Sequence, residues 1–248
     1  MMTRIAPALS FALFILVWFV AGRLTPQADV FLPAPDKVAA ALRDLFVEQD
    51  FANDVVQSIY RVMLGFALAM VVGYPLGIAI GVSKAWEGWV QPLNEFARYL
   101  PVAALIPLVI VWAGIGDLQK ILIIFLGTVF QIVPMVSDTA KRVPNTLLEL
   151  GQMMGFSRWR RVIKIVIPAT APEVYDHARI ALGWAWSYLI VAELVAANTG
   201  IGHVIIQAQR FIQTADVMAG IITIGVIGLA FDTIFRMPKR AFFPWTRS

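Results

Sequence analysis

Long apolar runs alternate with short polar stretches along this chain of 248 residues. An α-helix needs about 20 consecutive apolar residues to cross the ~30 Å hydrocarbon core of a bilayer. Several runs approach that length, so the pattern predicts an all-α polytopic membrane protein with about six transmembrane helices. We expect these helices at about residues 5–21, 55–82, 92–113, 118–137, 178–197 and 217–235.

The composition supports a membrane protein. Apolar residues make up 59% of the chain, whereas a soluble domain has about 45–50%. This excess lies in the long runs, which predicts a single transmembrane domain over residues 1–248. The net charge of +4 comes from basic residues at the ends of the runs, so we expect no nucleic acid partner. The absence of cysteine excludes a disulfide framework and a thiol nucleophile, and 2 histidines argue against a metal site.

The first run has two interpretations. Arg4 followed by apolar residues is compatible with a cleaved signal peptide. The length of the run and the flank at Gly22, Arg23 and Leu24 favour an uncleaved helix instead. The acidic stretch 25–54 that follows contains Val38, Leu42 and Leu45 at helical spacing, which predicts an amphipathic helix.

Small residues recur at every fourth position of the second run. Such a stripe lets another helix approach closely, and packing within the subunit is favoured over a subunit interface. The stripe consists of Gly65, Ala69, Gly73, Gly77 and Gly81.

Prolines mark bends in two of the predicted spans. Pro75 predicts a kink in the second span. Pro101 and Pro107 predict that the third span is broken or bent.

Polar residues inside the fourth and fifth spans are candidates for a translocation path. Gly127, Thr128 and Gln131 fall close to one helical face, and Ser187 lies in the fifth span. A glutamine at this depth faces protein or a wet cavity rather than lipid. A buried interhelical hydrogen bond is the equally weighted alternative.

Glu193 lies about one turn inside the outer end of the fifth span. A carboxylate there is costly unless it is paired or hydrated. Facing a dimer axis, it would contribute to an outer gate. Facing the bundle, it would pair with a base such as Arg61, and the sequence slightly favours this structural pairing.

Basic residues set the predicted topology. They collect on one side of the spans, and the positive-inside rule places that side in the cytoplasm. Both chain termini and the segment 138–172 are therefore expected there. The basic residues on this side are Arg4, Lys84, Lys141, Arg142, Arg158, Arg160, Arg161, Lys164, Arg236, Lys239, Arg240 and Arg247.

The polar segment after the fourth span is predicted to form helix, break and helix. Thr146 and Glu149 have the spacing of a capping box. Gly155 is expected to close the first helix in a left-handed conformation, and Ser157 to cap the second. In the second helix Trp159, Val162, Ile163 and Val166 would form one apolar stripe, and Pro168 and Pro172 are expected to end it.

This segment resembles the EAA loop of permease subunits in bacterial ABC importers. Glu149, Gly155, Ile165 and Pro168 stand at the spacing of that motif. Leu150 and Gly151 replace its two alanines, and Ile167 replaces its final leucine. The resemblance implies that a loop at about 138–172 docks a separate ATPase. The residues implicated are Glu149, Gly151, Gly155, Phe156, Ser157, Arg158 and Pro168.

Further segments resemble the nitrate, sulfonate, taurine and bicarbonate branch of this family. They are Phe31 to Pro35 (FLPAP), Pro101 to Leu108 (PVAALIPL), Trp112 to Gly116 (WAGIG) and Val191 to Leu194 (VAEL). The resemblance implies an importer of a small oxyanion or organic sulfonate in the bacterial cytoplasmic membrane. Relatives that carry pyrimidine-type vitamin precursors are the alternative substrate class.

ATP is expected to bind elsewhere. The chain contains no GxxxxGK[ST] sequence, so we expect a permease rather than an enzyme, with no catalytic residue and no cofactor. The resemblance implies two ATPase subunits that bind ATP and Mg²⁺, a second permease copy, and an extracytoplasmic binding protein. The membrane lipid is the remaining partner.

Two other functions stay open from the residues alone. An ion- or proton-coupled carrier would use His177, Arg179 and Glu193 as a charge relay. A scaffold subunit would need no polar path, and Gln131 and Glu193 would then be ordinary interhelical contacts.

Overall fold

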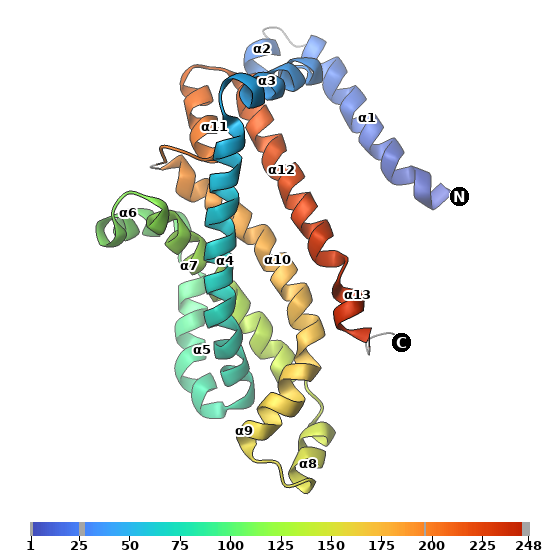
Figure 1. Ribbon diagram of the computed structural model, residues 1–248, viewed down its shortest axis with the longest axis vertical. Coiled ribbons are helices and arrows are strands. Elements are labelled where there is room, and N and C mark those ends of the chain that lie inside the picture. The colour runs from blue at the N-terminus through green and yellow to red at the C-terminus, as the bar shows by residue number, and fades with distance from the viewer. Residues whose placement is uncertain (1, 25–27, 196, 245–248) are drawn as a thin grey trace. The chain divides into compact units, whose positions relative to one another are not determined.

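The computed structural model describes residues 2–24, 28–195 and 197–244. In these residues the regular structure is helical throughout, without a strand, as the sequence predicts (Figure 1). The chain divides into two compact units, Met1–Ser58 with Ala196–Ile227, and Ile59–Val195 with Gly228–Ser248.

The first unit contains the amphipathic helix predicted in the acidic stretch. Its helices are α1 (Met2–Leu24), α2 (Ala28–Phe31), α3 (Pro35–Glu48), the start of α4 (Phe51–Val82), α11 (Ile201–Arg210) and most of α12 (Thr214–Arg236). Val38 and Leu45 of α3 are buried with Phe51 and Ile201 in one apolar core. The Asp54 carboxylate accepts the backbone N–H of Gly200 at 2.5 Å, which fixes the start of α11.

The second unit holds the features that bear on function. Its helices are the rest of α4, then α5 (Lys84–Arg98), α6 (Val102–Ala113), α7 (Asp117–Lys141), α8 (Asn145–Met153), α9 (Arg158–Arg161), the π-helix η1 (Val162–Val166), α10 (Ile167–Leu194), the end of α12 and α13 (Lys239–Phe242). Helix α10 packs along α7, and α5 and α6 contact α7 as well.

The small-residue stripe of α4 packs inside the subunit, as predicted. A Cβ atom on Gly77 would lie 2.6 Å from the Cβ of Val136 in α7. A Cβ atom on Gly81 would lie 2.4 Å from the Cβ of Ala140. Such distances are far below van der Waals contact, so these glycines allow α4 and α7 to approach closely.

The predicted third span is broken into two helices. Helices α5 and α6 meet at an angle of 102°, with Pro101 at the N-cap of α6. Since the ring of Pro101 disfavours helical geometry for Leu100, the break falls there. Pro107 lies within α6 and Pro75 within α4, so neither residue ends a helix.

Three helices of the described chain are long and apolar enough to cross a membrane. They are α4, α7 and α12, and the bent pair α5 and α6 makes a fourth if it counts as one span. The apolar part of α1, Leu9–Leu24, is shorter. The count of six spans therefore stays a prediction.

Candidate functional site

Helix α8 ends in the turn that Gly155 was predicted to make. Gly155 has φ of +76°, and its N–H donates to the carbonyl of Gln152 at 2.9 Å. The N–H of Phe156 donates to the carbonyl of Gly151, also at 2.9 Å. These two bonds form a Schellman motif, which satisfies carbonyls that a helix end otherwise leaves unpaired. A side chain at Gly155 would meet no atom within 4 Å, so only the backbone conformation requires glycine.

Ser157 begins the next helix, again as predicted. Its side-chain oxygen accepts the backbone N–H of Arg160 at 3.3 Å. An oxygen at this position satisfies one of the four unpaired N–H groups of a helix start. The chain therefore reverses between α8 and α9 through a glycine closure followed directly by a serine cap. We call residues 145–161 the coupling hairpin.

The predicted capping box at the start of α8 is wrong. The helix begins at Asn145 with Pro144 at the N-cap, and that cap has no side-chain hydrogen bond. Thr146 is thus already inside the first turn. A helical residue cannot act as N-cap, because that position requires non-helical backbone angles.

The prediction that Pro168 and Pro172 end the second helix is also wrong. Helix α9 continues through η1 into α10, which includes both prolines. In η1 the N–H of Ile167 donates to the carbonyl of Val162, five residues earlier. This wider turn lies directly before Pro168, which has no N–H to donate. The fifth helix consequently starts at Ile167 instead of near residue 178.

Gly151 joins α8 to η1, the helix that follows the hairpin. It is the buried residue of α8, and a Cβ atom there would lie 2.4 Å from the Cδ1 of Ile165. The Arg161 guanidinium donates to the Gln152 side-chain oxygen at 3.3 Å beside it. A small residue at position 151 thus allows α8 to pack on η1.

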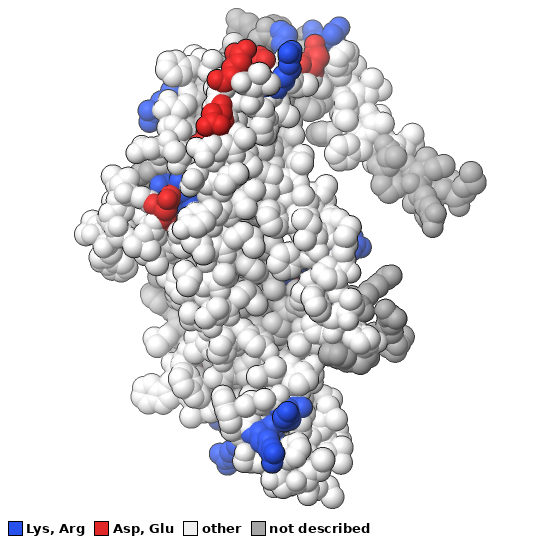
Figure 2. Space-filling view, in the orientation of Figure 1, with Lys and Arg blue, Asp and Glu red and all other residues white. Residues whose placement is uncertain are grey.

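Most of the other hairpin residues are exposed, whereas Leu148, Phe156 and Arg161 are half-buried. Glu149, Ser157 and Arg158 are exposed, and so are large apolar side chains, namely Leu150, Met153, Met154 and Trp159. Of the predicted apolar stripe only Val166 is fully buried. Figure 2 shows Lys and Arg atoms gathered at the end where Figure 1 places α8 and α9. The hairpin therefore presents an apolar and basic surface.

A second cluster lies among α4, α7 and α10. The Arg61 guanidinium is 2.6 Å from the Glu193 carboxylate, and its Nε and Nη2 each lie 2.7 Å from one oxygen of Asp117. The side chains of Arg61 and Glu193 are 2% and 0% exposed. We call these three residues the Arg61 cluster. The pairing of Glu193 with Arg61, the bundle-facing alternative from the sequence, is confirmed.

Two polar residues that follow Asp117 in α7 are also buried. Lys120 is 2% exposed, and its Nζ donates to the carbonyl of Gly116 at 3.0 Å. Gln119 is fully buried, and its side-chain amide has no hydrogen-bond partner among the described residues. Sequence reasoning missed Asp117 as part of the cluster. Its only signal was an acidic residue directly before a predicted span.

The candidate path residues differ in their surroundings. Gly127 is buried against the Tyr188 ring, which a Cβ atom would approach to 2.5 Å. Thr128 is buried, and its hydroxyl has no partner in the described structure. Gln131 is half-buried, whereas Ser187 is exposed. No hydrogen bond between described residues joins Ser187 to the others, so their shared role as a path stays a prediction.

Comparison with known proteins decides the family. Residues 70–248 match the family of the binding-protein-dependent transport system inner membrane component. The chain belongs to this family. The matched region includes the hairpin and helices α5 to α10. It also includes Asp117 and Glu193 of the Arg61 cluster, but not Arg61. The family that the EAA-like residues indicated is thereby confirmed.

Two relatives show the branch. This permease is 32% identical over 239 residues to the taurine transport system permease protein TauC of Escherichia coli (strain K12). The alignment covers 94% of this chain and 87% of TauC. The permease is 27% identical over 237 residues to the nitrate import permease protein NrtB of Synechocystis sp., covering 92% of this chain and 85% of NrtB.

A solved structure supports the fold. The permease resembles a chain in the crystal structure of a bacterial ABC transporter involved in the import of the acidic polysaccharide alginate. The TM-score is 0.62 at 16% identity, and the match covers 96% of each chain. At this identity the likeness shows the fold alone.

Proposed function

We propose that this chain is the transmembrane subunit of an ATP-driven ABC importer for a small oxyanion or organic sulfonate. The observation that carries the proposal is the coupling hairpin in a chain of this permease family. The family membership supplies the transport function, and the hairpin supplies a defined surface on which a separate ATPase can act.

The geometry of the hairpin supports a docking role. Its backbone is fixed by the Gly155 closure and the Ser157 cap, and Gly151 holds α8 against η1. Met153, at 85% exposed, and Trp159, at 72%, stand outside this frame. Exposed apolar groups rimmed by charges are typical of protein interfaces. Glu149, Arg158 and Phe156 would lie within or beside the contact, and Pro168 would hold the joint to α10.

The family membership supports the following assembly. Two ATPase subunits would bind ATP and Mg²⁺ and move the hairpins of two permease copies. An extracytoplasmic binding protein would deliver the solute. Since the helices from α9 through η1 to α10 are continuous, a displaced hairpin would tilt α10 without an intervening flexible linker. Such coupling is a two-state rearrangement biased by nucleotide.

This surface is proposed to lie in the cytoplasm. The basic residues of the hairpin support a cytoplasmic side by the positive-inside rule. We therefore assign the protein to the bacterial inner membrane, with both termini cytoplasmic. The path would lie on the axis between two copies, bordered by Gly127, Thr128, Gln131 and Ser187.

The names of two relatives support the substrate class. TauC is a taurine permease and NrtB a nitrate permease. Taurine and nitrate share a small size and an anionic oxygen-bearing group. The proposed substrate has that chemistry.

The test is stimulation of ATP hydrolysis in the reconstituted complex. The permease, its ATPase and its binding protein are placed in proteoliposomes with taurine or nitrate as the added solute. We expect solute-loaded binding protein to raise the ATPase rate several-fold, with solute accumulating on the opposite side. Solute uptake without any ATPase subunit would instead support a carrier that acts alone and would overturn the proposal.

A further inference from the structure

One face of the end of α12 lies on α10, within the second unit (Figure 1). The Phe231 ring packs on the Trp186 ring, with 5.9 Å between the two centroids. An oxygen of the Asp232 carboxylate lies 3.0 Å from Nε of Arg179. Phe231, Asp232 and Phe235 share one face of the helix and are half-buried, whereas the two residues between Asp232 and Phe235 are exposed. The end of α12 therefore meets α10 along a single stripe of side chains.

Tyr175 of α10 holds the last turn of α12. Its hydroxyl donates to the carbonyl of Phe235 at 2.7 Å. Phe235 lies one residue before the end of α12 at Arg236, where carbonyls lack a partner inside the helix. The Tyr175 ring also lies 6.1 Å from the Phe235 ring, 6.4 Å from that of Phe242 and 5.7 Å from that of Phe243. The tyrosine thus fixes the end of α12 to α10 through a polar contact and several aromatic ones.

Lys239 adds an ion pair beyond the end of α12. It is the first residue of α13, and its Nζ donates to the Asp176 carboxylate. The Phe235 ring also lies 6.3 Å from the Phe66 ring of α4. The ion pairs made by Lys239 and Arg179 are both partly exposed, so each is weak by itself. The attachment therefore depends on several contacts that act together.

We call residues 231–243 the tail strap, and α12 joins this strap to the first unit. The start of α12 is anchored in that unit, because Ala219 is buried in the apolar core and the Thr214 hydroxyl donates to the carbonyl of Val30 at 2.7 Å. With both termini assigned to the cytoplasm, this start lies on the outer side, where the binding protein would dock. Helix α12 is therefore a covalent connection between the outer side and the strap.

We propose that the tail strap carries the signal of the solute-loaded binding protein from the first unit to the coupling hairpin. The inference rests on the proposed function and adds a route to it. When α12 shifts, the strap makes α10 shift with it, and α10 continues through η1 into the hairpin. Packed side chains and rigid helices are the elements that carry such coupling. Tyr175, Asp176 and Arg179 are then positioning residues, because they act through α12 and α13.

The first experiment loosens the strap without removing its rings. Tyr175→Phe and Asp176→Asn are combined in one strap variant, which deletes the hydrogen bond to Phe235 and the ion pair with Lys239. ATP hydrolysis is measured in proteoliposomes that contain the ATPase, with and without the binding protein loaded with taurine or nitrate. We expect the ratio of the stimulated to the basal rate to fall about fivefold, because one net hydrogen bond contributes about that factor. A loss of folded protein would lower both rates alike and leave this ratio unchanged.

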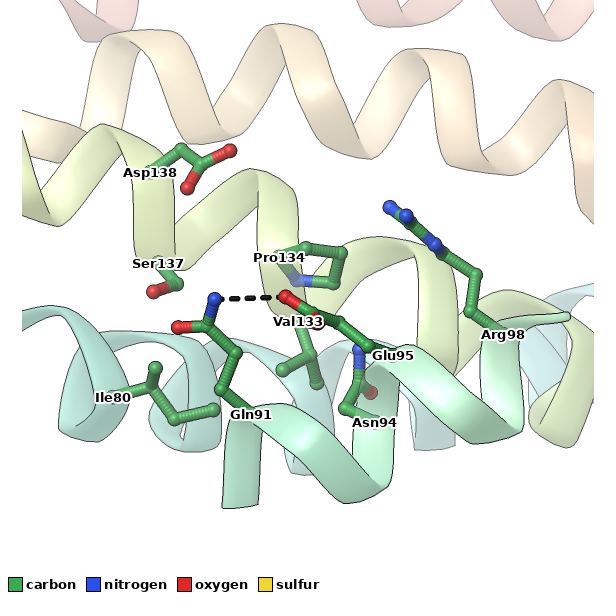
Figure 3. A pocket seen from close by; sticks show the side chains of 9 residues that line it. All are labelled: Ile80, Gln91, Asn94, Glu95, Arg98, Val133, Pro134, Ser137 and Asp138. Atoms are coloured by element: carbon green, nitrogen blue, oxygen red, sulfur yellow. Dashed lines mark hydrogen bonds between the residues drawn. The ribbon is translucent and has the colours of Figure 1, made fainter. Parts of the chain in front are cut away.

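Glu87→Gln is the matched control. Glu87 pairs with Lys141 and is 41% exposed, and Asp176 is 40% exposed in its pair with Lys239. The Glu87 pair joins α5 to α7, outside the proposed route. Lys141 also donates to Gln91 at 3.1 Å, and Figure 3 shows Gln91 of α5 pointing toward α7, so one contact between these helices remains. We expect a wild-type ratio in the control. A wild-type ratio in the strap variant, or an equal fall in both variants, overturns the proposal.

A second experiment restores the strap with a covalent link. The chain has no cysteine, so Asp176→Cys and Lys239→Cys together introduce one reactive pair. We expect the ratio to fall in this double variant and to return to the wild-type value when a short bismaleimide joins the two sulfur atoms, because α10 and α12 move together in the proposed route. Asp176→Cys alone, treated with the same reagent, should keep its lowered ratio. Loss of all stimulation after cross-linking would show that the strap opens in each cycle and would overturn the proposal.

The outcomes distinguish this inference from the proposed function. Stimulation of the wild-type complex, with the same ratio in the strap variant, leaves the importer in place and removes the route. A wild-type complex that the binding protein does not stimulate removes the importer itself. The unfolding midpoints of the strap variant and of Glu87→Gln are expected to be similar, since both lose a partly exposed ion pair. A much lower midpoint for the strap variant, with an unchanged ratio, would assign the strap to stability alone.

Discussion

The coupling hairpin and the Arg61 cluster are built in opposite ways. The hairpin is held by backbone hydrogen bonds between residues three to five positions apart, and most of its side chains are exposed. The cluster joins Arg61 to residues 56 and 132 positions away, and two of its three side chains are almost fully buried. One region is fixed by local turn geometry and the other by ionic contacts across three helices.

This difference separates stability from coupling. A change in the cluster leaves a charge without its partner in a buried place, which affects the whole unit. A change in the hairpin alters one exposed turn and leaves the core intact. We therefore expect cluster variants to lower the stability of the protein and hairpin variants to lower its coupling to an ATPase.

The largest expected effect is that of Arg61→Gln. It leaves Glu193 buried without its counter-charge, which costs on the order of 3–5 kcal/mol. Thermal unfolding in detergent should show a lower midpoint and less folded protein after purification. The control is Arg142→Gln, because Arg142 pairs with Glu173 at an exposed site, where the loss is at most about 1 kcal/mol. A similar fall of the unfolding midpoint in both variants would contradict the claim that burial makes the Arg61 pair costly to break.

Glu193→Gln is expected to destabilise the protein less than Arg61→Gln does. Arg61 keeps its contact with Asp117, so one counter-charge remains. The double variant Arg61→Met with Glu193→Met removes both buried charges and should recover part of the loss. Unfolding midpoints of the three variants test this order. If Glu193→Gln kept wild-type stability but changed transport, the residue would act in a gate.

Gly77→Ala tests the close packing that aligns α4 with α7. The added methyl group would lie 2.6 Å from Val136, and overpacking of this kind costs about 1–3 kcal/mol. Gly88→Ala is the matched control, because a Cβ atom on Gly88 in α5 meets nothing within 4 Å. Alanine there should be neutral or stabilise the helix by up to about 1 kcal/mol. Equal unfolding midpoints would show that the α4–α7 contact is looser than the structure indicates.

The smallest effect expected is that of Ser157→Ala. Loss of the cap should cost about 1 kcal/mol and should remain local. Hydrogen exchange should accelerate at the backbone N–H of Arg160, with little change in the unfolding midpoint. Ser83→Ala is the control, because Ser83 is the N-cap of α5 without a side-chain hydrogen bond. If each substitution accelerated hydrogen exchange at the start of its own helix, the Ser157 hydroxyl would make no specific contribution.

Local features could be predicted from the sequence, and contacts between distant residues mostly could not. Gly155, Ser157 and the break at Pro101 were predicted because glycine, serine and proline restrict the backbone around themselves. Pairing of Glu193 with Arg61 was one of two alternatives, since only the cost of a buried charge pointed to it. Asp117 was missed because spacing along the chain carries no information about which helices meet.

Some local predictions were wrong because neighbouring residues outweighed the motif. Thr146 has capping-box spacing, yet the helix starts one residue earlier, directly after Pro144. Pro168 usually signals a helix end, yet η1 widens the preceding turn and lets the helix continue. Ser187 and Thr128 were grouped by polarity and depth; Ser187 is exposed on α10 and Thr128 is buried, and their shared role as a path stays a prediction.

The central claim is that the hairpin transmits ATPase movement, and Gly155→Val tests it most directly. Valine resists the φ of +76° found at this position, at a cost of about 1–3 kcal/mol. Gly114→Val is the matched control, because Gly114 has φ of +75° and equally open surroundings, in a turn outside the hairpin. The measurement is ATP hydrolysis stimulated by loaded binding protein in the reconstituted complex. The account predicts loss of stimulation for Gly155→Val and its retention for Gly114→Val, with both proteins inserted in the membrane. Normal stimulation in Gly155→Val, or equal loss in both variants, would contradict it.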